Sequence, residues 1–352
     1  MSGGRRQRAA TIYDVAVAAG VSHQTIANVI KFPSRVAPST RERVERCIAE
    51  LGFRPNRTAQ NLSRRTSRLI GFRVPARSAL ASGGLFDAFL ADLAAAAEAI
   101  DHHIVLFHSE PGLGEVAKAV ELYGANVADA FVIAETEADD PRVPALVDAR
   151  LSFVAFGRTE HPGVHHWVDT DNVAGGRLAT AHLADVGHRT IGFCGWPGRS
   201  WVGEDRRAGW RTELAARGLP CDDSLTVAAL NRRDLAAAAC AELLQRRLEV
   251  TAIVAASDEL ALGAQEAAVA TGRTVSIVGY DDSPAASIGA GLTTVRQPIA
   301  AIARRIVDLT ARLLAGEVAT AEQVRLAPEL IVRGSSAAPA TTANNTTAKG
   351  DT

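Results

Sequence analysis

Apolar residues near the N-terminus recur with the spacing of three short helices, each with one buried face. The expected buried residues are Ile12, Val15, Ala16 and Ala19 in the first helix, Ile26, Val29 and Ile30 in the second, and Val44, Cys47, Ile48 and Leu51 in the third. Gly20 stands between the first two helices, and Gly52 follows the third, where a glycine can end a helix. The pattern predicts a helix-turn-helix unit closed by a third helix.

Polar residues that can cap helices stand where each of these helices is expected to begin. They are Thr11 with Asp14 three residues later, Ser22, and Ser39 with Glu42 three residues later. Such side chains accept hydrogen bonds from the free N–H groups of the first turn, and the Ser39–Glu42 spacing is that of a capping box. The caps therefore place the expected helix starts at Thr11, Ser22 and Ser39.

From residue 69 the pattern changes to short apolar strands that alternate with longer helical stretches. A first series has expected strands at 69–74, 104–108, 130–134 and 153–156, and helices at 85–100, 115–123 and 141–149. A second series has expected strands at 166–169, 190–194, 225–230, 252–256 and 275–280, and helices at 174–186, 205–217, 235–247 and 259–271. Alternating βα units imply parallel sheets covered by helices, so we expect two Rossmann-like subdomains joined near residues 157–166.

The second short helix carries hydrogen-bonding side chains on its outward face. These residues are Ser22, His23, Gln24, Thr25 and Asn28. In a helix-turn-helix unit the start of the second helix enters the major groove, and amides such as Gln24 and Asn28 suit bidentate pairing to adenine. The alternative is an ordinary solvated face, but the ordered set of caps, turn and periodicity favours DNA binding.

Two sequence segments carry a family resemblance. Val-Ser-His-Gln-Thr-Ile-Ala-Asn-Val-Ile, followed by Arg-Pro-Asn-Arg-Thr-Ala-Gln-Asn-Leu, resembles the lactose-repressor (LacI/GalR) family of bacterial transcription regulators, and the likeness continues to about residue 335. Departures fall at Asn28, Ala27 and Lys31, where the family commonly has arginine, serine and asparagine. These positions lie on or beside the reading face, so no operator sequence can be carried over from a relative.

The resemblance implies that the segment after the third helix is a hinge helix that folds on operator DNA in the minor groove. Leu62 matches the leucine that wedges between base pairs, and the flanking pattern is matched by Asn56, Arg57, Ala59 and Gln60. Thr11 and Arg57 are the expected contacts to the DNA backbone. The alternative is that this segment is only a polar linker, because a helix this short is marginal alone.

The resemblance also implies a two-lobed periplasmic-binding-protein-like body with parallel sheets. The chain is expected to cross between the lobes three times, with the later crossings near residues 293–298 and 324–328 and a helix at 299–314 returning to the first lobe. The expected division is a basic disordered arm (1–10), an all-α headpiece (11–54), a hinge (55–66), an effector-binding and dimerisation domain (67–335) and a disordered tail (336–352).

Ligands in open α/β sheets bind beyond the carboxyl ends of strands, and several expected effector residues stand there. Arg206 and Asp281 also match family positions, and a guanidinium with a carboxylate suits sugar hydroxyls. Weaker candidates are Phe86, Trp196, Ser257 and Asn231. The alternatives are surface ion pairs, helix caps and ordinary packing. Asn231 replaces a common family aromatic and Gly157 an aspartate, so the identity of the ligand stays open.

The charge distribution supports a DNA-binding arm on a separate sensing body. Residues 1–68 hold 13 Lys and Arg against 4 Asp and Glu, whereas the remainder holds 25 against 35. The basic part supplies phosphate affinity, for which the candidates are Arg5, Arg6, Arg8, Arg57, Arg64 and Arg65.

Four cysteines without metal-ligand spacing, and the absence of a long apolar run, predict a cytoplasmic, nucleoid-associated protein with no membrane segment. His102-His103 and His165-His166 carry no supporting ligand pattern, so no metal or cofactor is expected.

The expected function is a homodimeric regulator, most often a repressor in this family, that binds a near-palindromic operator. A sugar would bind between the lobes, and the resemblance to an actinobacterial branch implies a glucoside or an oligosaccharide; whether it induces or co-represses stays open. The alternatives are a solute-binding or carbohydrate-binding protein with the same body, or an α/β enzyme. No catalysis is expected, because the chain has no G-x-G-x-x-G, P-loop or G-x-S-x-G motif.

Overall fold

The computed structural model describes most of the chain as two compact units, Met1–Ser67 and Arg68–Thr352. The described residues are 10–53, 66–74, 84–161, 163–198, 200–289, 291–317 and 320–339. Most of the expected basic arm, hinge and C-terminal tail lies outside these residues, as do Asn56, Arg57, Ala59, Gln60 and Leu62.

The N-terminal unit, here called the headpiece, contains the three expected helices. They are α1 (Ile12–Ala19), α2 (His23–Lys31) and α3 (Pro38–Leu51), with a 3-10 turn η1 (Pro33–Arg35) between the last two. Thr11 and Ser22 cap α1 and α2 as expected, and the left-handed glycines Gly20 and Gly52 end α1 and α3. The core of the headpiece consists of Val15, Ala16, Ala19, Ile26, Val29, Val44 and Phe53.

Two expectations for α3 are wrong. The helix begins at Pro38 after Ala37, with no side-chain cap, so Ser39 and Glu42 form no capping box. Proline suits the first helical position because its φ is fixed and its missing N–H has no partner there anyway. Leu51 is 41% exposed. Phe53, just beyond the helix end, fills the core instead.

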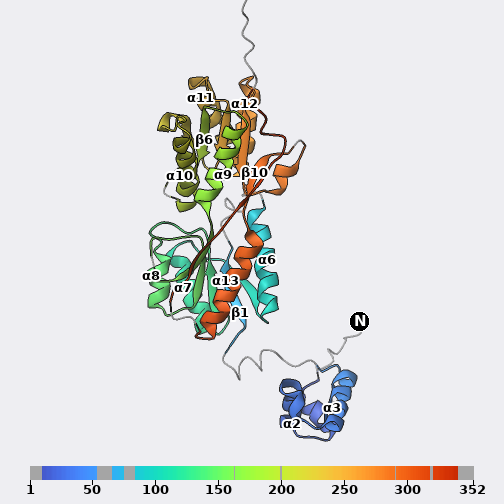
Figure 1. The fold of residues 1–352 in the computed structure, drawn as a ribbon. Coiled ribbons are helices and arrows are strands. Elements are labelled where there is room, and N and C mark those ends of the chain that lie inside the picture. The colour runs from blue at the N-terminus through green and yellow to red at the C-terminus, as the bar shows by residue number, and fades with distance from the viewer. Residues whose placement is uncertain are drawn as a thin grey trace, which may run out of the picture. The chain divides into compact units, whose positions relative to one another are not determined.

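The larger unit contains two six-stranded sheets and their covering helices (Figure 1). The first lobe has strand order β11-β5-β4-β3-β1-β2, and the second has β12-β10-β9-β8-β6-β7. Bounds in the first lobe are β1 (Leu69–Arg73), β2 (His103–Phe107), β3 (Ala130–Ile133), β4 (Phe153–Phe156), β5 (His166–Thr170), β11 (Gln323–Leu326), α6 (Leu85–Ala99), α7 (Leu113–Gly124), α8 (Arg142–Asp148) and α13 (Ile299–Leu314).

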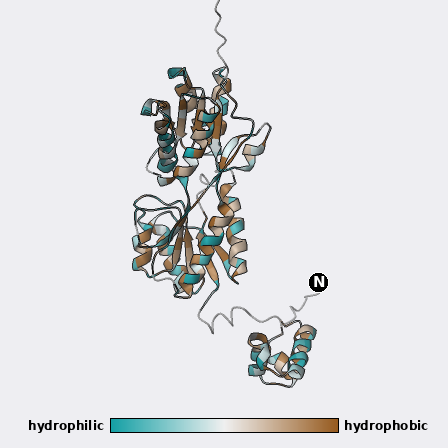
Figure 2. Cartoon of the chain, in the orientation of Figure 1, coloured by the Kyte–Doolittle hydropathy of each residue, from teal (hydrophilic) through white to brown (hydrophobic). Residues whose placement is uncertain are grey.

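The second lobe follows the same βα plan, with one antiparallel edge strand, β12, beside β10. Its bounds are β6 (Ile191–Gly195), β7 (Thr226–Ala228), β8 (Ala252–Ala255), β9 (Ser276–Tyr280), β10 (Thr293–Arg296), β12 (Glu329–Ile331), α9 (Asn172–Asp185), α10 (Trp201–Ala216), α11 (Arg233–Arg246), α12 (Asp258–Ala270), η2 (Asp223–Leu225) and η3 (Pro284–Ser287). Its strands β6, β8 and β9 are mostly apolar, and the helices around them carry both hydrophilic and hydrophobic residues (Figure 2).

The first sheet buries both faces because successive side chains of a strand point to opposite sides. Phe72, Val154 and Val168 pack with α6 and α13 on one face. Phe131, Phe153 and Trp167 pack with α7 and α8 on the other. Figure 1 shows orange α13 alongside cyan α6, although the two helices are far apart in the sequence.

The expectation that residues 166–169 begin the second series is wrong. β5 lies in the first sheet, paired in parallel with β4 on one side and β11 on the other. All five of its residues are buried, so the local pattern fits a central strand of either sheet. The first crossing therefore follows β5, at residues 170–172, and not at 157–166.

The two later crossings confirm the expected connections. The chain leaves the second lobe between β10 and α13, at Gln297–Pro298, and α13 packs on α6. It returns between β11 and β12, at Ala327–Pro328. Each crossing joins the carboxyl end of a strand to the other lobe, so the strand ends of both sheets face the junction between the lobes.

Candidate functional site

The headpiece presents the polar residues of α2 on the side opposite its buried residues. Ser22 caps the helix: its Oγ accepts the N–H of Thr25 at 3.1 Å and lies 2.9 Å from the Thr25 hydroxyl. His23 and Gln24 are exposed, and Asn28 is half-buried one turn after Gln24. With the opposite face packed into the core through Ile26, this surface offers amide and hydroxyl groups on a rigid helix.

The start of α1 is the second polar feature of the headpiece. Thr11 and Asp14 form a reciprocal capping box, in which the N–H and hydroxyl of Thr11 each donate to the Asp14 carboxylate at 2.7 Å. Tyr13 is 65% exposed, and its ring centroid lies 5.5 Å from that of His23. Sequence reasoning missed Tyr13; its signal is an aromatic residue on the polar face of an otherwise amphipathic helix.

A cavity of about 280 Å³ lies between the lobes of the larger unit, at the carboxyl ends of their strands. The first-lobe wall is largely apolar and includes Phe72, Leu85, Phe86, Phe89 and Phe156. The second-lobe wall and the crossing strands supply polar groups, among them Ser200, Arg206, Asn231, Asp281 and Gln297. The aromatic rings therefore lie mainly on the first-lobe wall, whereas hydrogen-bonding groups lie on both walls.

Arg206 projects from α10 into this cavity, where hydrogen bonds and aromatic rings hold it. Its Nε donates to Asn172 Oδ1 at 2.9 Å, and its Nη1 donates to the carbonyl of Ala256. The guanidinium carbon lies 3.5 Å from the ring centroid of Tyr280 and 5.3 Å from that of Trp196. These contacts fix the planar guanidinium in one orientation.

Asp281 stands opposite Arg206, directly after β9. Its Oδ1 accepts from Gln297 Nε2 at 2.7 Å and lies 3.6 Å from Arg206 Nη1. Burial raises the pKa of Asp281 to about 7, although the charge of Arg206 acts in the opposite direction. Its φ of 115° is a strained backbone conformation, of the kind that clusters at ligand sites.

Asp169 is a cavity residue that sequence reasoning missed. It lies at the end of β5; its Oδ1 accepts from the N–H of Thr170 at 2.7 Å and its Oδ2 from the N–H of Arg158 at 3.1 Å. Burial raises its pKa to about 6, against the effect of these hydrogen bonds. Its signal in the sequence is a carboxylate at the end of a strand. Its position in the cleft follows only when β5 is assigned to the first sheet.

The weaker effector candidates divide into two groups. Phe86, Trp196 and Asn231 line the cavity, and Trp196 Nε1 is buried without a hydrogen-bond partner among the described residues. Ser257 lies behind Asn231: its Oγ donates to Asn231 Oδ1 at 2.6 Å and accepts the N–H of Leu260 at 3.2 Å. Ser257 is thus placed to orient Asn231 and to cap α12.

Gly157 lies where the cavity has little room for a side chain. It lines the cavity with φ 111°, and a Cβ added there would lie 2.3 Å from Thr136 Oγ1. An aspartate at this position would clash unless Thr136 moved. The hydroxyl of Thr136 occupies the space of that side chain.

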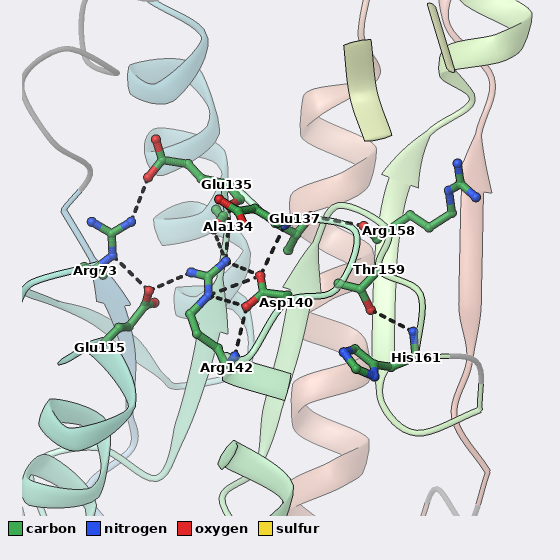
Figure 3. A network of polar contacts seen from close by, with 11 residues as sticks. Arg73, Glu115, Ala134, Glu135, Glu137, Asp140, Arg142, Arg158, Thr159 and His161 are labelled. Atoms are coloured by element: carbon green, nitrogen blue, oxygen red, sulfur yellow. Dashed lines mark hydrogen bonds and ion pairs between the residues drawn. The ribbon is translucent and has the colours of Figure 1, made fainter. Parts of the chain in front are cut away.

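A buried charge network supports the first-lobe wall (Figure 3). Glu115 Oε2 accepts from Arg73 Nε at 2.9 Å and from Arg142 Nη1 at 2.7 Å. Arg142 also pairs with Asp140 at 2.6 Å and donates to the carbonyls of Ala134 and Glu135 at 3.0 and 3.2 Å. Because Ala134 and Glu135 line the cavity, the network fixes the backbone of this wall.

Other residues singled out in the sequence have structural roles. Trp210 is fully buried, and its Nε1 donates to the carbonyl of Ile191 at 3.2 Å. His165 is buried against Phe153, and burial lowers its pKa to about 4. Across the described ranges, no cluster of three or more His, Cys, Asp or Glu side chains could hold a metal ion. None of the described helices is long and apolar enough to cross a membrane.

Comparison with known proteins agrees with both units. Residues 11–56 match the bacterial regulatory proteins of the lacI family, and residues 180–336 match the periplasmic binding protein-like domain. The transcriptional regulator CelR of Thermobifida fusca is 34% identical over 342 residues, which cover 94% of this chain and 99% of CelR.

Two solved structures extend over nearly the whole chain. A complex of the transcriptional regulator CelR with cellobiose has a TM-score of 0.71 and 30% identity, and covers 93% of this chain and 99% of its own. The lac repressor dimer bound to operator and the anti-inducer ONPF has a TM-score of 0.80 and 26% identity, and covers 94% and 100%. The helix-turn-helix headpiece, the two-lobed body and these relatives together show that the chain belongs to the lacI family of bacterial regulatory proteins and is a DNA-binding transcription regulator, not an enzyme.

Proposed function

We propose that this regulator is a repressor that binds a near-palindromic operator as a homodimer and responds to a sugar bound between its lobes. The observation that carries the effector assignment is the Arg206–Asp281 pair, at 3.6 Å, in a cavity with an aromatic wall. A guanidinium donates to hydroxyls and a carboxylate accepts from them, while aromatic rings pack against the apolar face of a pyranose. The cavity thus offers the groups that a sugar requires.

The relatives support the same chemical class. CelR has been solved with cellobiose, and the lac repressor has been solved as a dimer on its operator. A glucoside or a short oligosaccharide is therefore the proposed effector, contacting Asp281, Arg206, Phe86, Trp196 and Asn231, with Ser257 acting through Asn231. The protein would act in the cytoplasm, where the DNA is.

On DNA, we assign the major-groove contacts to Ser22, His23, Gln24, Thr25 and Asn28. Thr11 and Arg57 would contact the backbone, and a hinge at residues 55–66 would enter the minor groove through Asn56, Ala59, Gln60 and Leu62. Replacement of Leu62 by alanine should then weaken specific operator binding far more than non-specific binding, because the wedge acts only on a kinked site. Equal losses on both DNAs would remove the wedge role.

The proposal is tested by binding of the full-length protein to its own upstream DNA, titrated with glucose, cellobiose and other mono- and disaccharides. We expect a specific complex whose affinity changes with one of these sugars. The Asp281→Asn variant should bind the same DNA without the sugar response, and Asp223→Asn, at an exposed carboxylate of η2, should behave as wild type. Specific binding that no sugar alters would retain the DNA role and overturn the sugar assignment.

A further inference from the structure

An ion pair joins the two lobes beside the cavity. Arg158 follows β4 in the first lobe, and Asp205 lies on α10 in the second. One terminal nitrogen of Arg158 donates to both carboxylate oxygens of Asp205, at 2.7 and 2.8 Å. Trp201, one turn before Asp205 on the same helix, covers the guanidinium, whose carbon lies 4.0 Å from the ring centroid.

This pair is shielded from water much more than the surface pairs of the protein. The side chains of Arg158 and Asp205 are 19% and 16% exposed. Partly buried charges attract each other more strongly than exposed ones, and removal of one partner leaves the other desolvated without compensation. The indole of Trp201 adds a cation–π contact. The pair therefore gives the two lobes a well-defined point of contact beside the cavity.

Both partners are also connected to the cleft arginine. Asp205 immediately precedes Arg206 on α10. From the other side, the N–H of Arg158 donates to Asp169, which accepts from Asn172 Nδ2 at 3.3 Å, and Asn172 Oδ1 accepts from Arg206 Nε at 2.9 Å. A movement of Arg158 relative to the second lobe can therefore shift Arg206 in two ways. One is through the backbone of α10, and the other is through the hydrogen bonds of Asp169 and Asn172.

We propose that Arg158 and Asp205 are positioning residues of the effector site. The partners belong to different lobes, so the pair exists only while the lobes are close, and it holds the first turns of α10 so that Arg206 faces the ligand. Neither Arg158 nor Asp205 is among the described residues that line the cavity. The pair therefore acts through the positions of the lobes and not through contact with the ligand. The inference rests on the cleft being the effector site.

The pair makes effector affinity depend on residues that the ligand does not touch. Without the ion pair, only a fraction of the protein has its lobes close together before the ligand binds. The apparent affinity is then the affinity of the closed protein multiplied by that fraction. We expect about a tenfold weaker effector Kd when either partner is neutralised. The double neutral variant should be no weaker than either single variant, because the second substitution removes the charge that the first left unpaired.

The decisive experiment uses the ligand-free, full-length protein. Hydrogen exchange by mass spectrometry would compare peptides that cover residues 153–161 and 201–210 in wild type, R158Q, D205N and the double variant. Each single variant should exchange about tenfold faster in both peptides, with no further increase in the double variant. Additive effects, or exchange as slow as in wild type, would overturn the proposal.

A matched control lies on the same helix. Arg207 pairs with Asp223 at 2.7 Å, but both residues belong to the second lobe. The R207Q variant should therefore leave exchange in residues 153–161 at the wild-type rate. If D205N fails to fold, R158K serves as the second variant, since lysine keeps the charge and loses the planar guanidinium that stacks on Trp201.

Calorimetric titration with cellobiose separates this proposal from the proposed function. A tenfold weaker Kd in R158Q, and an unchanged Kd in R207Q, are expected. If wild type does not bind cellobiose, the assignment of that sugar fails, while the exchange experiment still decides whether the ion pair couples the lobes.

Discussion

Arg206 Nη1 lies 3.6 Å from Asp281 Oδ1, so α10 and the end of β9 bring opposite charges together inside the cleft. Burial nevertheless raises the pKa of Asp281 to about 7. The folded protein therefore holds a proton between about pH 4 and pH 7 that the unfolded chain releases, so this carboxyl makes stability fall as pH rises through that range. Asp169 and Asp258, whose pKa values burial raises to about 6, act in the same direction.

The Asp281→Asn variant should lose this pH dependence. Between pH 5 and pH 7.5, the free energy of unfolding of wild type should fall relative to that of the variant by about 1 kcal/mol or more, because a full proton difference contributes about 1.4 kcal/mol per pH unit. Urea unfolding at a series of pH values measures this difference. Parallel stability curves would show that Asp281 is ionised throughout.

Specific operator binding should depend on the amides of α2. Gln24→Ala and Asn28→Ala should each cost about 1–3 kcal/mol on the operator, since each amide can make two hydrogen bonds to one base. Both variants should bind unrelated DNA as wild type does. Fluorescence anisotropy at fixed salt compares the two DNAs, with Glu50→Ala near the end of α3 as a control that should leave the specificity ratio unchanged. A uniform loss on both DNAs would contradict base reading.

The crossing of α9 and α10 leaves no room for a side chain between them. A Cβ at Gly209 would lie 2.2 Å from the carbonyl oxygen of Val173, and one at Gly176 would lie 2.2 Å from that of Arg206. Gly209→Ala should therefore destabilise the protein by about 1–3 kcal/mol, because backbone must move, and should also weaken the effector response through Arg206. Gly124→Ala, with no atom within 4 Å of the added Cβ, should instead stabilise the end of α7 by about 0.5–1 kcal/mol. Equal thermal shifts for the two variants would refute the packing argument.

Arg142 should be among the most costly arginines to replace. Arg142→Met leaves Glu115 and Asp140, both at most 3% exposed, without their shared partner, and we expect a loss of about 3–5 kcal/mol. Arg150→Met, at an exposed site in the same lobe, should change the stability by no more than about 0.5 kcal/mol. Denaturant unfolding of both variants checks this. A mild effect at Arg142 would mean that the network can rearrange.

Local patterns in the sequence predict most elements of this fold but not all of their partners. The βα alternation identifies the strands and helices because burial of one helix face or of a whole strand leaves a periodic trace. It does not assign β5, because a strand buried on both faces fits either sheet. The cleft positions of Arg206 and Asp281 can be predicted from the helix and the strand that carry them. The role of Asp169 and the pairing of Arg158 with Asp205 cannot, because they depend on contacts between distant segments. The capping box at Ser39 fails because a neighbouring proline competes for the helix start.

The return of α13 and β11 to the first lobe also has a consequence for synthesis on the ribosome. The headpiece core is complete at Phe53, but the first lobe lacks one covering helix and an edge strand until residues up to Leu326 have emerged. At about 5–20 residues per second this interval is roughly 15–55 s. During this interval the nascent chain lacks the apolar face of α13, which later covers α6 and the first sheet. All residues of the headpiece core are therefore synthesised well before those that complete the first lobe. Truncation before α13 would remove part of the first lobe, and with it the effector response, but would leave the headpiece sequence intact.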